Sequence, residues 1–117
     1  MKSILFGDDD EDFRKSYKRL LTLKKFEIDE VSNTHNLIEK ARNGSYNLII
    51  TDNDYEDKVG GIEAIKMIRE IDKETHILLQ TTSLTPEVRA SALEAGANYV
   101  LNKNDLPSLM EILINLK

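Results

Sequence analysis

The stretch Asn47-Leu48-Ile49-Ile50-Thr51-Asp52 decides how the rest of the sequence is interpreted. Residues 48–50 form an unbroken apolar run with β-branched members, which is typical of a central strand buried on both faces. The run ends at Asp52, and the polar segment 53–61 that follows predicts a loop. Open α/β sheets bind ligands at the carboxyl ends of their parallel strands, so Asp52 lies where such a site is expected.

Four other segments also have the pattern of strands, at residues 3–7, 26–31, 77–81 and 99–101. Apolar residues at three- and four-residue spacing predict an amphipathic helix after each strand. This alternation predicts an α/β fold, a doubly wound five-stranded parallel sheet in the order 2-1-3-4-5 with five helices. The helical sets are Phe13, Tyr17, Leu20 and Leu21; Leu37, Ile38 and Ala41; Ile62, Ile65, Ile68 and Ile71; Val88, Ala92 and Ala95; and Leu109, Ile112, Leu113 and Leu116.

Capping residues mark the ends of several of these helices. Asp10 and Asp12 lie at the start of the first helix, where a carboxylate accepts hydrogen bonds from free N–H groups, and we interpret both as capping residues. The other expected boundaries are Asn33-Thr34 and Asn43-Gly44 for the second helix and Thr85-Pro86 and Gly96 for the fourth.

The composition indicates one globular domain over residues 1–117, with 40% hydrophobic and 32% charged residues. The sequence has no cysteine, no signal-peptide pattern and no apolar run that could span a membrane, so we expect a cytoplasmic protein without a membrane partner. Its net charge of −5 argues against direct binding of nucleic acid. Lys117 ends the sequence without linker-like residues, which favours a stand-alone protein over a fragment of a longer chain.

Three carboxylates are expected to meet at one edge of the sheet. Asp8 and Asp9 end the first strand and Asp52 ends the third, so the order 2-1-3-4-5 places them around one crevice. Two like charges about 4 Å apart repel by on the order of 4 kcal/mol at an effective dielectric near 20. Either some of these carboxylates are protonated or a cation lies among them, and oxygen ligands favour Mg²⁺.

The fourth and fifth strands add two more functional groups to this edge. Thr81 ends the fourth strand and brings a hydroxyl, and Lys103 follows the fifth and brings a positive charge. A carboxylate, a dication, an ammonium and a hydroxyl together form a site for a phosphoryl group on an aspartate.

Four motifs now stand together in order, Ile4-Leu5-Phe6-Gly7-Asp8-Asp9-Asp10, Leu48-Ile49-Ile50-Thr51-Asp52, Leu78-Leu79-Gln80-Thr81 and Gly96-Ala97-Asn98-Tyr99-Val100-Leu101-Asn102-Lys103. With them the sequence resembles the response-regulator receiver domains of two-component signalling (CheY-like), over essentially all of its 117 residues. The resemblance implies a flavodoxin-like fold, with Asp52 accepting phosphate from a histidine kinase, a phosphotransfer protein or a small phosphodonor. It implies that Asp8, Asp9, Asp52 and the main-chain carbonyl of Asp54 hold Mg²⁺. Thr81 would hydrogen-bond the phosphoryl oxygen and Lys103 would pair with it.

The same resemblance implies how the signal is passed on. Phosphate on Asp52 would bias two arrangements of the fourth helix, fifth strand and fifth helix, and a downstream target protein would read the difference. The expected state is a monomer or weak dimer. No enzyme activity is expected beyond self-phosphorylation from small phosphodonors and self-dephosphorylation.

Several positions depart from the family pattern. Tyr55-Glu56-Asp57-Lys58 replaces the usual Met-Pro, and this loop is one residue longer. Thr82 is bulkier than the usual Ala or Gly, and Asn104 follows Lys103 where proline is common. The switch aromatic of the fifth strand is replaced by Val100, and Tyr99 one place earlier points to the opposite face of the sheet. We therefore expect that reorientation of a buried aromatic does not carry the signal.

Two other classes of function compete with the phosphorylated switch. A receiver-like binding module that works without phosphate is consistent with the altered loop, Thr82 and Val100. A small phosphatase of the haloacid-dehalogenase type is suggested by Asp52-Asn53-Asp54, but the sequence has no segment for a substrate cap. Other residues have plainer interpretations: His35 and His76 as surface histidines, and Met67 and Met110 as core residues.

Overall fold

The computed structural model describes residues 2–116. The expected domain limits at residues 1 and 117, and the interpretation drawn from Lys117, fall outside this range. Strands and helices alternate along the described chain. The elements are β1 Ser3–Gly7, α1 Glu11–Leu23, β2 Glu27–Val31, α2 Thr34–Asn43, β3 Leu48–Asp52, α3 Gly61–Arg69, β4 His76–Thr81, α4 Pro86–Ala95, β5 Tyr99–Asn102 and α5 Leu106–Leu116.

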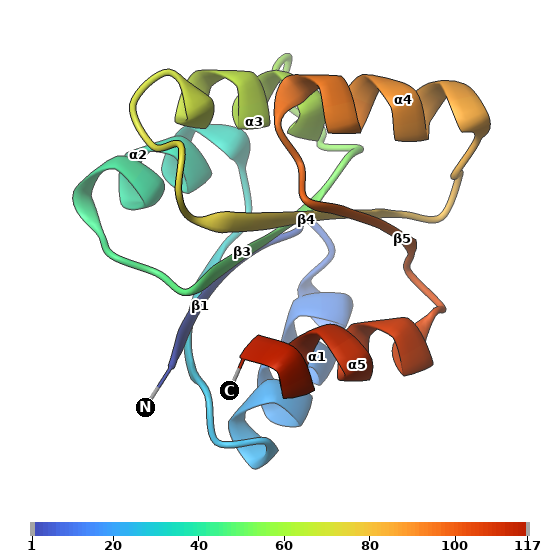
Figure 1. Ribbon diagram of the computed structural model, residues 1–117. Helices are drawn as coiled ribbons and strands as arrows, with labels where there is room; N and C mark the ends of the chain where they lie inside the picture. The colour runs from blue at the N-terminus through green and yellow to red at the C-terminus, as the bar shows by residue number, and fades with distance from the viewer. Residues whose placement is uncertain (1, 117) are drawn as a thin grey trace.

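The five strands form one parallel sheet in the order β2-β1-β3-β4-β5, which confirms the predicted fold class and strand order. Three helices, α2, α3 and α4, cover one face, and α1 and α5 cover the other, as Figure 1 shows. The order reverses direction between β1 and β3. Their carboxyl ends therefore lie side by side at the switch point of the sheet.

Each face of the sheet has its own hydrophobic core, because successive side chains of a strand point to opposite faces. In β3, Leu48 and Ile50 pack with residues of α1 and α5, whereas Ile49 packs with residues of α2, α3 and α4. β3 is buried along its whole length, as the apolar run predicts. Two-sided burial of this strand fixes the position of Asp52 at its end.

Most of the predicted capping residues cap their helices, but Asp12 lies inside the first turn of α1 and is not its N-cap. The Asp10 side chain accepts hydrogen bonds from the N–H groups of Asp12 and Phe13, so Asp10 is the N-cap of α1. Asn33 and Thr85 cap α2 and α4 in the same way. Gly96 ends α4 with a φ of 121°, a left-handed conformation that a residue with a Cβ rarely adopts.

The prediction for the third helix was wrong at its end. α3 stops at Arg69, and Ile71 lies beyond it with 59% of its surface exposed. Three residues advance about 300° around a helix, so a strict three-residue repeat rotates away from the buried face. The predicted Ile65 and Ile68 are buried, together with Gly61 and Ala64, and Ile62 is partly buried against the same core. Met67 is also 38% exposed, so it is not the core residue that we expected.

None of the helices within residues 2–116 has both the length and the apolar character needed to cross a membrane.

Candidate functional site

Three carboxylates meet at the carboxyl edge of the sheet. Asp8, Asp9 and Asp52 each place one carboxylate oxygen so that these three atoms lie within 4.8 Å of one another. Asp8 is fully buried and Asp52 is 4% exposed, whereas Asp9 is half-buried. The convergence predicted from the strand order is therefore confirmed for these residues.

Lys103 supplies the positive charge of this cluster. Its Nζ lies 2.7 Å from Asp8 Oδ2 and 3.4 Å from Asp52 Oδ1, and its side chain is 12% exposed. Burial of the ammonium opposes ionisation, but hydrogen bonding to Asp8 and the charges of Asp52 and Asp8 outweigh it, so the pKa of Lys103 is raised. One ammonium thus contacts two of the three carboxylates, those of Asp8 and Asp52.

Two aromatic residues of α1 contact Lys103. Its Nζ lies 4.5 Å from the centroid of the Phe13 ring, a cation–π distance, and the Tyr17 hydroxyl donates to the Lys103 carbonyl oxygen at 3.3 Å. The Tyr17 ring stacks on both Phe6 and Phe13, with centroids 5.1 and 4.4 Å apart. The sequence assigned Phe13 and Tyr17 only to the apolar face of a helix, so their contact with the site was missed.

Asp52 has an environment that disfavours its charged form. Burial and the charge of Asp8 raise its pKa from 3.8 to about 6, against the lowering effect of Lys103. The N–H of Asn53 donates to Asp52 Oδ1 at 2.9 Å. At neutral pH this carboxylate is mostly ionised. Its ionisation costs free energy, and a bound cation would reduce that cost.

Asp8 is oriented by contacts within its own loop and with α1. Its Oδ1 accepts from the Asp10 N–H at 2.9 Å, which leaves Oδ2 facing Lys103. Arg14 Nη1 donates to the carbonyl oxygen of Asp8 at 2.7 Å, and Arg14 Nε lies 3.4 Å from Glu30 Oε1. These contacts fix a fully buried carboxylate next to the acceptor position.

Thr81 reaches the same edge but contacts a different aspartate. Its Oγ1 lies 3.5 Å from Asp54 Oδ2, a long hydrogen bond, and accepts from the Ser83 N–H at 3.1 Å. Thr81 is fully buried, whereas Asp54 is exposed. The expected roles of Thr81 toward a phosphoryl group and of the Asp54 carbonyl toward Mg²⁺ stay predictions.

The loop after Asp52, which departs from the family pattern, is packed against the rest of the site. The Tyr55 hydroxyl lies 2.9 Å from Thr51 Oγ1, and Asp57 Oδ2 accepts from both the N–H and the hydroxyl of Thr34. The Glu56 N–H donates to Asp9 Oδ2 at 3.0 Å. Neither Tyr55 nor Asp57 was recognised from the sequence, because their partners lie on other elements.

Gln80 is a second feature that the sequence interpretation missed. It is paired with Asp52 in the β3–β4 register and is 2% exposed. Leu78, two residues earlier, packs on the side of α1 and α5, so the alternation of strand side chains places Gln80 on the same side. Among residues 2–116, none provides a hydrogen-bond partner for its Nε2. A buried amide beside the acceptor is unusual, and its place within the apolar run 77–81 was a signal that could have been used.

Other departures from the family pattern lie where strand alternation places them. Val100 is buried in the core beneath α2, α3 and α4, while Tyr99 packs on the α1 and α5 side. The Tyr99 hydroxyl lies 3.2 Å from His76 Nδ1. Thr82 is exposed, and His35 and His76 are exposed as predicted. The prediction that Tyr99 points away from Val100 is therefore confirmed.

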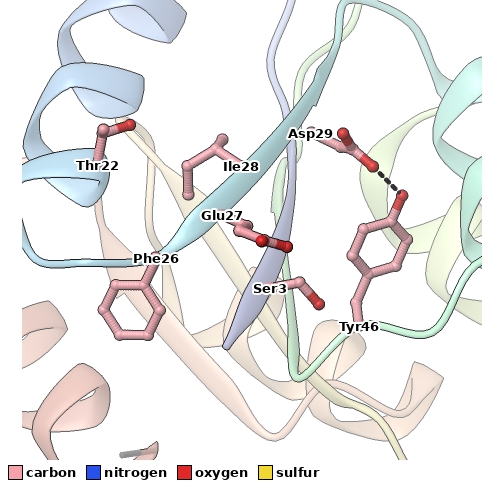
Figure 2. A pocket seen from close by; sticks show the side chains of 7 residues that line it. All are labelled: Ser3, Thr22, Phe26, Glu27, Ile28, Asp29 and Tyr46. Carbon is pink, nitrogen blue, oxygen red and sulfur yellow. Dashed lines mark hydrogen bonds between the residues drawn. The ribbon is translucent and has the colours of Figure 1, made fainter. Parts of the chain in front are cut away.

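A surface hollow of about 420 Å³ lies at the other end of the sheet, away from the carboxylates. Figure 2 shows the Tyr46 hydroxyl directed at Asp29 across it, at 2.6 Å. Glu27 and Asp29 of β2 are exposed there. The residues that line it are Ser3, Thr22, Phe26, Glu27, Ile28, Asp29 and Tyr46. Within residues 2–116, the search for clusters of three or more potential ligands gives only the group at the carboxyl edge, so the hollow is not a second candidate for the metal.

The donor set at the carboxyl edge fits Mg²⁺. Its three converging ligand atoms are all carboxylate oxygens, which are the ligands of hard cations, and they lie at the carboxyl ends of β1 and β3. The half-buried position of Asp9 leaves one side of the cluster open for water and for a phosphoryl group.

Comparisons with known proteins agree with this geometry. A family model described as "Response regulator receiver domain" matches residues 4–114. The chemotaxis protein CheY of Halobacterium salinarum is 31% identical over 112 residues, which cover 94% of this chain and 92% of that protein. The autoinducer 2 sensor kinase/phosphatase LuxQ of Vibrio parahaemolyticus is 36% identical over 87 residues, or 74% of this chain. The match spans only 10% of LuxQ.

A solved structure gives the same fold. The response regulator protein TrrA of Thermotoga maritima, in complex with Mg²⁺-BeF, superposes with a TM-score of 0.88 and 28% identity over 100% of both chains. These comparisons give no support to a phosphatase or to a binding module that works without phosphate.

Proposed function

Because this chain belongs to the response regulator receiver domain family, we propose that Mg²⁺-dependent phosphorylation of Asp52 is the event that it senses and passes on. The observation that carries the proposal is the convergence of Asp8, Asp9 and Asp52 within 4.8 Å, beside a lysine 3.4 Å from Asp52. In a cluster with three carboxylates and one ammonium, an additional positive charge would stabilise the ionised carboxylates.

In the proposed reaction, an ionised oxygen of Asp52 forms a bond to the phosphorus of the donor. The bond between phosphorus and the donor's leaving group breaks, and that group departs with the electron pair. The donor is a phosphohistidine of a kinase or phosphotransfer protein, or a small acyl phosphate such as acetyl phosphate. With its pKa raised to about 6, Asp52 is still mostly ionised at neutral pH and can act as the nucleophile.

Each residue of the cluster has a part in this step. Asp8, Asp9, Asp52 and the Asp54 carbonyl would hold Mg²⁺, which when bound neutralises charge on the transferring phosphoryl group. The Lys103 ammonium would turn from Asp52 toward a phosphoryl oxygen. Its raised pKa means that it is positively charged at neutral pH. Thr81 would give up its long contact with Asp54 and donate its hydroxyl to the same group.

The partners follow from the family and belong to the same proposal. A histidine kinase or phosphotransfer protein would supply the phosphate, and a downstream target protein would bind one of two conformations. We also propose a cytoplasmic location, a monomer or weak dimer, and one domain over residues 1–117. Self-phosphorylation and self-dephosphorylation would be the only chemistry, with no external substrate turned over.

The test is intact-mass spectrometry after incubation with acetyl phosphate and Mg²⁺. We expect one phosphoryl adduct on the parent protein, and none on Asp52→Asn or on the parent in the presence of EDTA. Equal adduct on parent and Asp52→Asn would contradict the assignment of the acceptor. An adduct that forms equally well with EDTA would contradict the metal requirement.

A further inference from the structure

The loop between β3 and α3, residues 53–60, is closed at its base beside the acceptor. The Gly61 N–H donates to the Asn53 carbonyl oxygen at 3.0 Å. A Cβ at Gly61 would overlap the carbonyl oxygen of Asp52, so only glycine allows the chain to return this close. The segment in between leaves the edge of the sheet and comes back to the same point.

Asp57, in the middle of this loop, binds the first residue of α2. Its Oδ2 accepts from the Thr34 hydroxyl at 2.7 Å and from the Thr34 N–H at 3.2 Å. Thr34 is 1% exposed. A carboxylate at a helix N-terminus is favoured by the helix dipole and satisfies a free N–H. Asn33 already caps the Asn36 N–H, so Asp57 is a second cap, supplied by a distant loop.

Tyr55 anchors the other side of the loop. Its hydroxyl lies 2.9 Å from Thr51 Oγ1, above Gly7 at the end of β1. A Cβ on Gly7 would lie 2.5 Å from that hydroxyl, so the missing side chain makes the space that Tyr55 fills. Burial raises the pKa of Tyr55 further above neutral pH.

Between these two anchors, the loop touches the carboxylate cluster. The Glu56 N–H donates to Asp9 Oδ2 at 3.0 Å. Residues 55–57 are consecutive, so the position of this N–H depends on the contact of Asp57 with α2. Asp9 is the least buried carboxylate of the three, and this hydrogen bond fixes one of its two oxygens.

We propose that the segment Tyr55–Asp57 couples cation binding at Asp9 to the N-terminus of α2, so that α2 responds to the state of the site. The proposal rests on the function proposed above and names a surface that responds, in addition to α4, β5 and α5. Asp57 acts as a positioning residue through the Glu56 N–H. Coupling is reciprocal: if the Asp57–Thr34 contact strengthens Mg²⁺ binding, Mg²⁺ strengthens that contact by the same factor.

The first test measures Mg²⁺ affinity by calorimetry. We expect Asp57→Ala to weaken Mg²⁺ binding by on the order of fivefold, within the usual range of coupling between sites. Asp57→Asn keeps an acceptor for Thr34 and should recover part of the affinity. Glu63→Gln removes an exposed charge on α3 and is the matched control, expected to stay within about twofold of the parent.

A double-mutant cycle with Thr34→Val, which removes the 2.7 Å hydroxyl contact and keeps the N–H contact, separates the stronger hydrogen bond from the loss of charge. If the contact is responsible, the effect of Asp57→Ala on Mg²⁺ affinity shrinks in the Thr34→Val background. Circular dichroism of each variant at the assay temperature establishes that it is folded. Undiminished, additive effects would mean that the charge of Asp57 acts directly, and the coupling through α2 would be wrong.

The second test reads the other direction of the coupling. Hydrogen exchange at the amides of the first turn of α2 should slow when Mg²⁺ is added to the parent, and not in Asp57→Ala. The last turn of α2 is the internal control. Parent affinity in Asp57→Ala, or exchange in the first turn that ignores Mg²⁺, would overturn the inference while leaving the proposed function intact. Failure of the parent to bind Mg²⁺ would overturn both.

Discussion

The two ends of the sheet arrange their acidic side chains in different ways. At the amino end, Asp29 is exposed and meets one neutral partner, the Tyr46 hydroxyl at 2.6 Å, beside an open hollow (Figure 2). At the carboxyl end, Asp8 and Asp52 are buried and both contact Lys103, and Asp9 lies beside them. In the first arrangement a single exposed carboxylate is hydrogen-bonded and open to solvent, so it needs no cation. The second holds more negative charge than its lysine neutralises, which is the condition for binding a cation.

The largest expected effect comes from removing the positive charge at the carboxyl end. Lys103→Met should lower the free energy of unfolding by roughly 3–5 kcal/mol without Mg²⁺, because it leaves the fully buried Asp8 without its partner. Urea unfolding measures this. Saturating Mg²⁺ should return part of the loss, since the cation takes over the role of the ammonium. A loss below 1 kcal/mol would mean that the cluster does not depend on this charge.

The pH dependence of stability tests the cost of ionising Asp52. Folding raises its pKa from 3.8 to about 6, so the folded protein binds more protons than the unfolded one between these values. The stability contributed by the protonated group is present below pH 4 and is lost as the pH rises through 6, on the order of 3 kcal/mol in all.

Asp52→Asn isolates this contribution, because other groups titrate in both proteins. Without Mg²⁺, the stability of the variant relative to the parent should rise between pH 4 and pH 7 by that amount. Chemical denaturation at a series of pH values measures it. A difference that stays constant with pH would contradict the raised pKa of Asp52.

Replacing Gln80 should have a smaller effect on the free energy of unfolding, and should raise it. Its Nε2 is buried without a hydrogen-bond partner in the described part of the chain, and an unsatisfied buried donor costs about 1–3 kcal/mol. Gln80→Leu should therefore raise the free energy of unfolding by about 1–2 kcal/mol, measured by urea unfolding. Destabilisation by a similar amount would show that the amide has a bound partner, such as an ordered water.

The smallest effect is expected at the amino end of the sheet. Tyr46→Phe removes the hydroxyl that donates to exposed Asp29, and we expect a loss of about 0.5–1 kcal/mol. The response of the melting temperature to Mg²⁺ should not change. If Tyr46→Phe altered that response as strongly as substitutions at the carboxyl end, the contrast between the two ends would be false.

The sequence predicted the carboxyl end well because parallel topology does most of the placement. Asp8, Asp9 and Asp52 each follow an apolar strand, and the parallel strand order then brings them together. The same rule places Lys103 after β5. Strand alternation also predicted that Val100 and Tyr99 point to opposite faces. These are periodic, local patterns that tertiary contacts did not override.

Other features depend on contacts that no local pattern encodes. Asp57 binds Thr34, 23 residues earlier in the chain, and Tyr55 fills the space over Gly7. Nothing in the spacing of these residues indicates that they meet. The error at Ile71 has another cause, because a three-residue repeat was extended beyond the turn at which it leaves the buried face. Function-bearing loops are thus less predictable than the strand ends they adjoin.

The most direct test of the carboxyl end is thermal unfolding across a Mg²⁺ titration, at pH 7. We predict that the melting temperature of the parent rises with Mg²⁺ concentration, because a bound cation relieves repulsion that folding imposes on Asp8, Asp9 and Asp52. Asp9→Asn should lose most of this rise, whereas Asp12→Asn, an exposed charge on α1, should keep it. A parent melting temperature that does not change with Mg²⁺ would contradict the metal site.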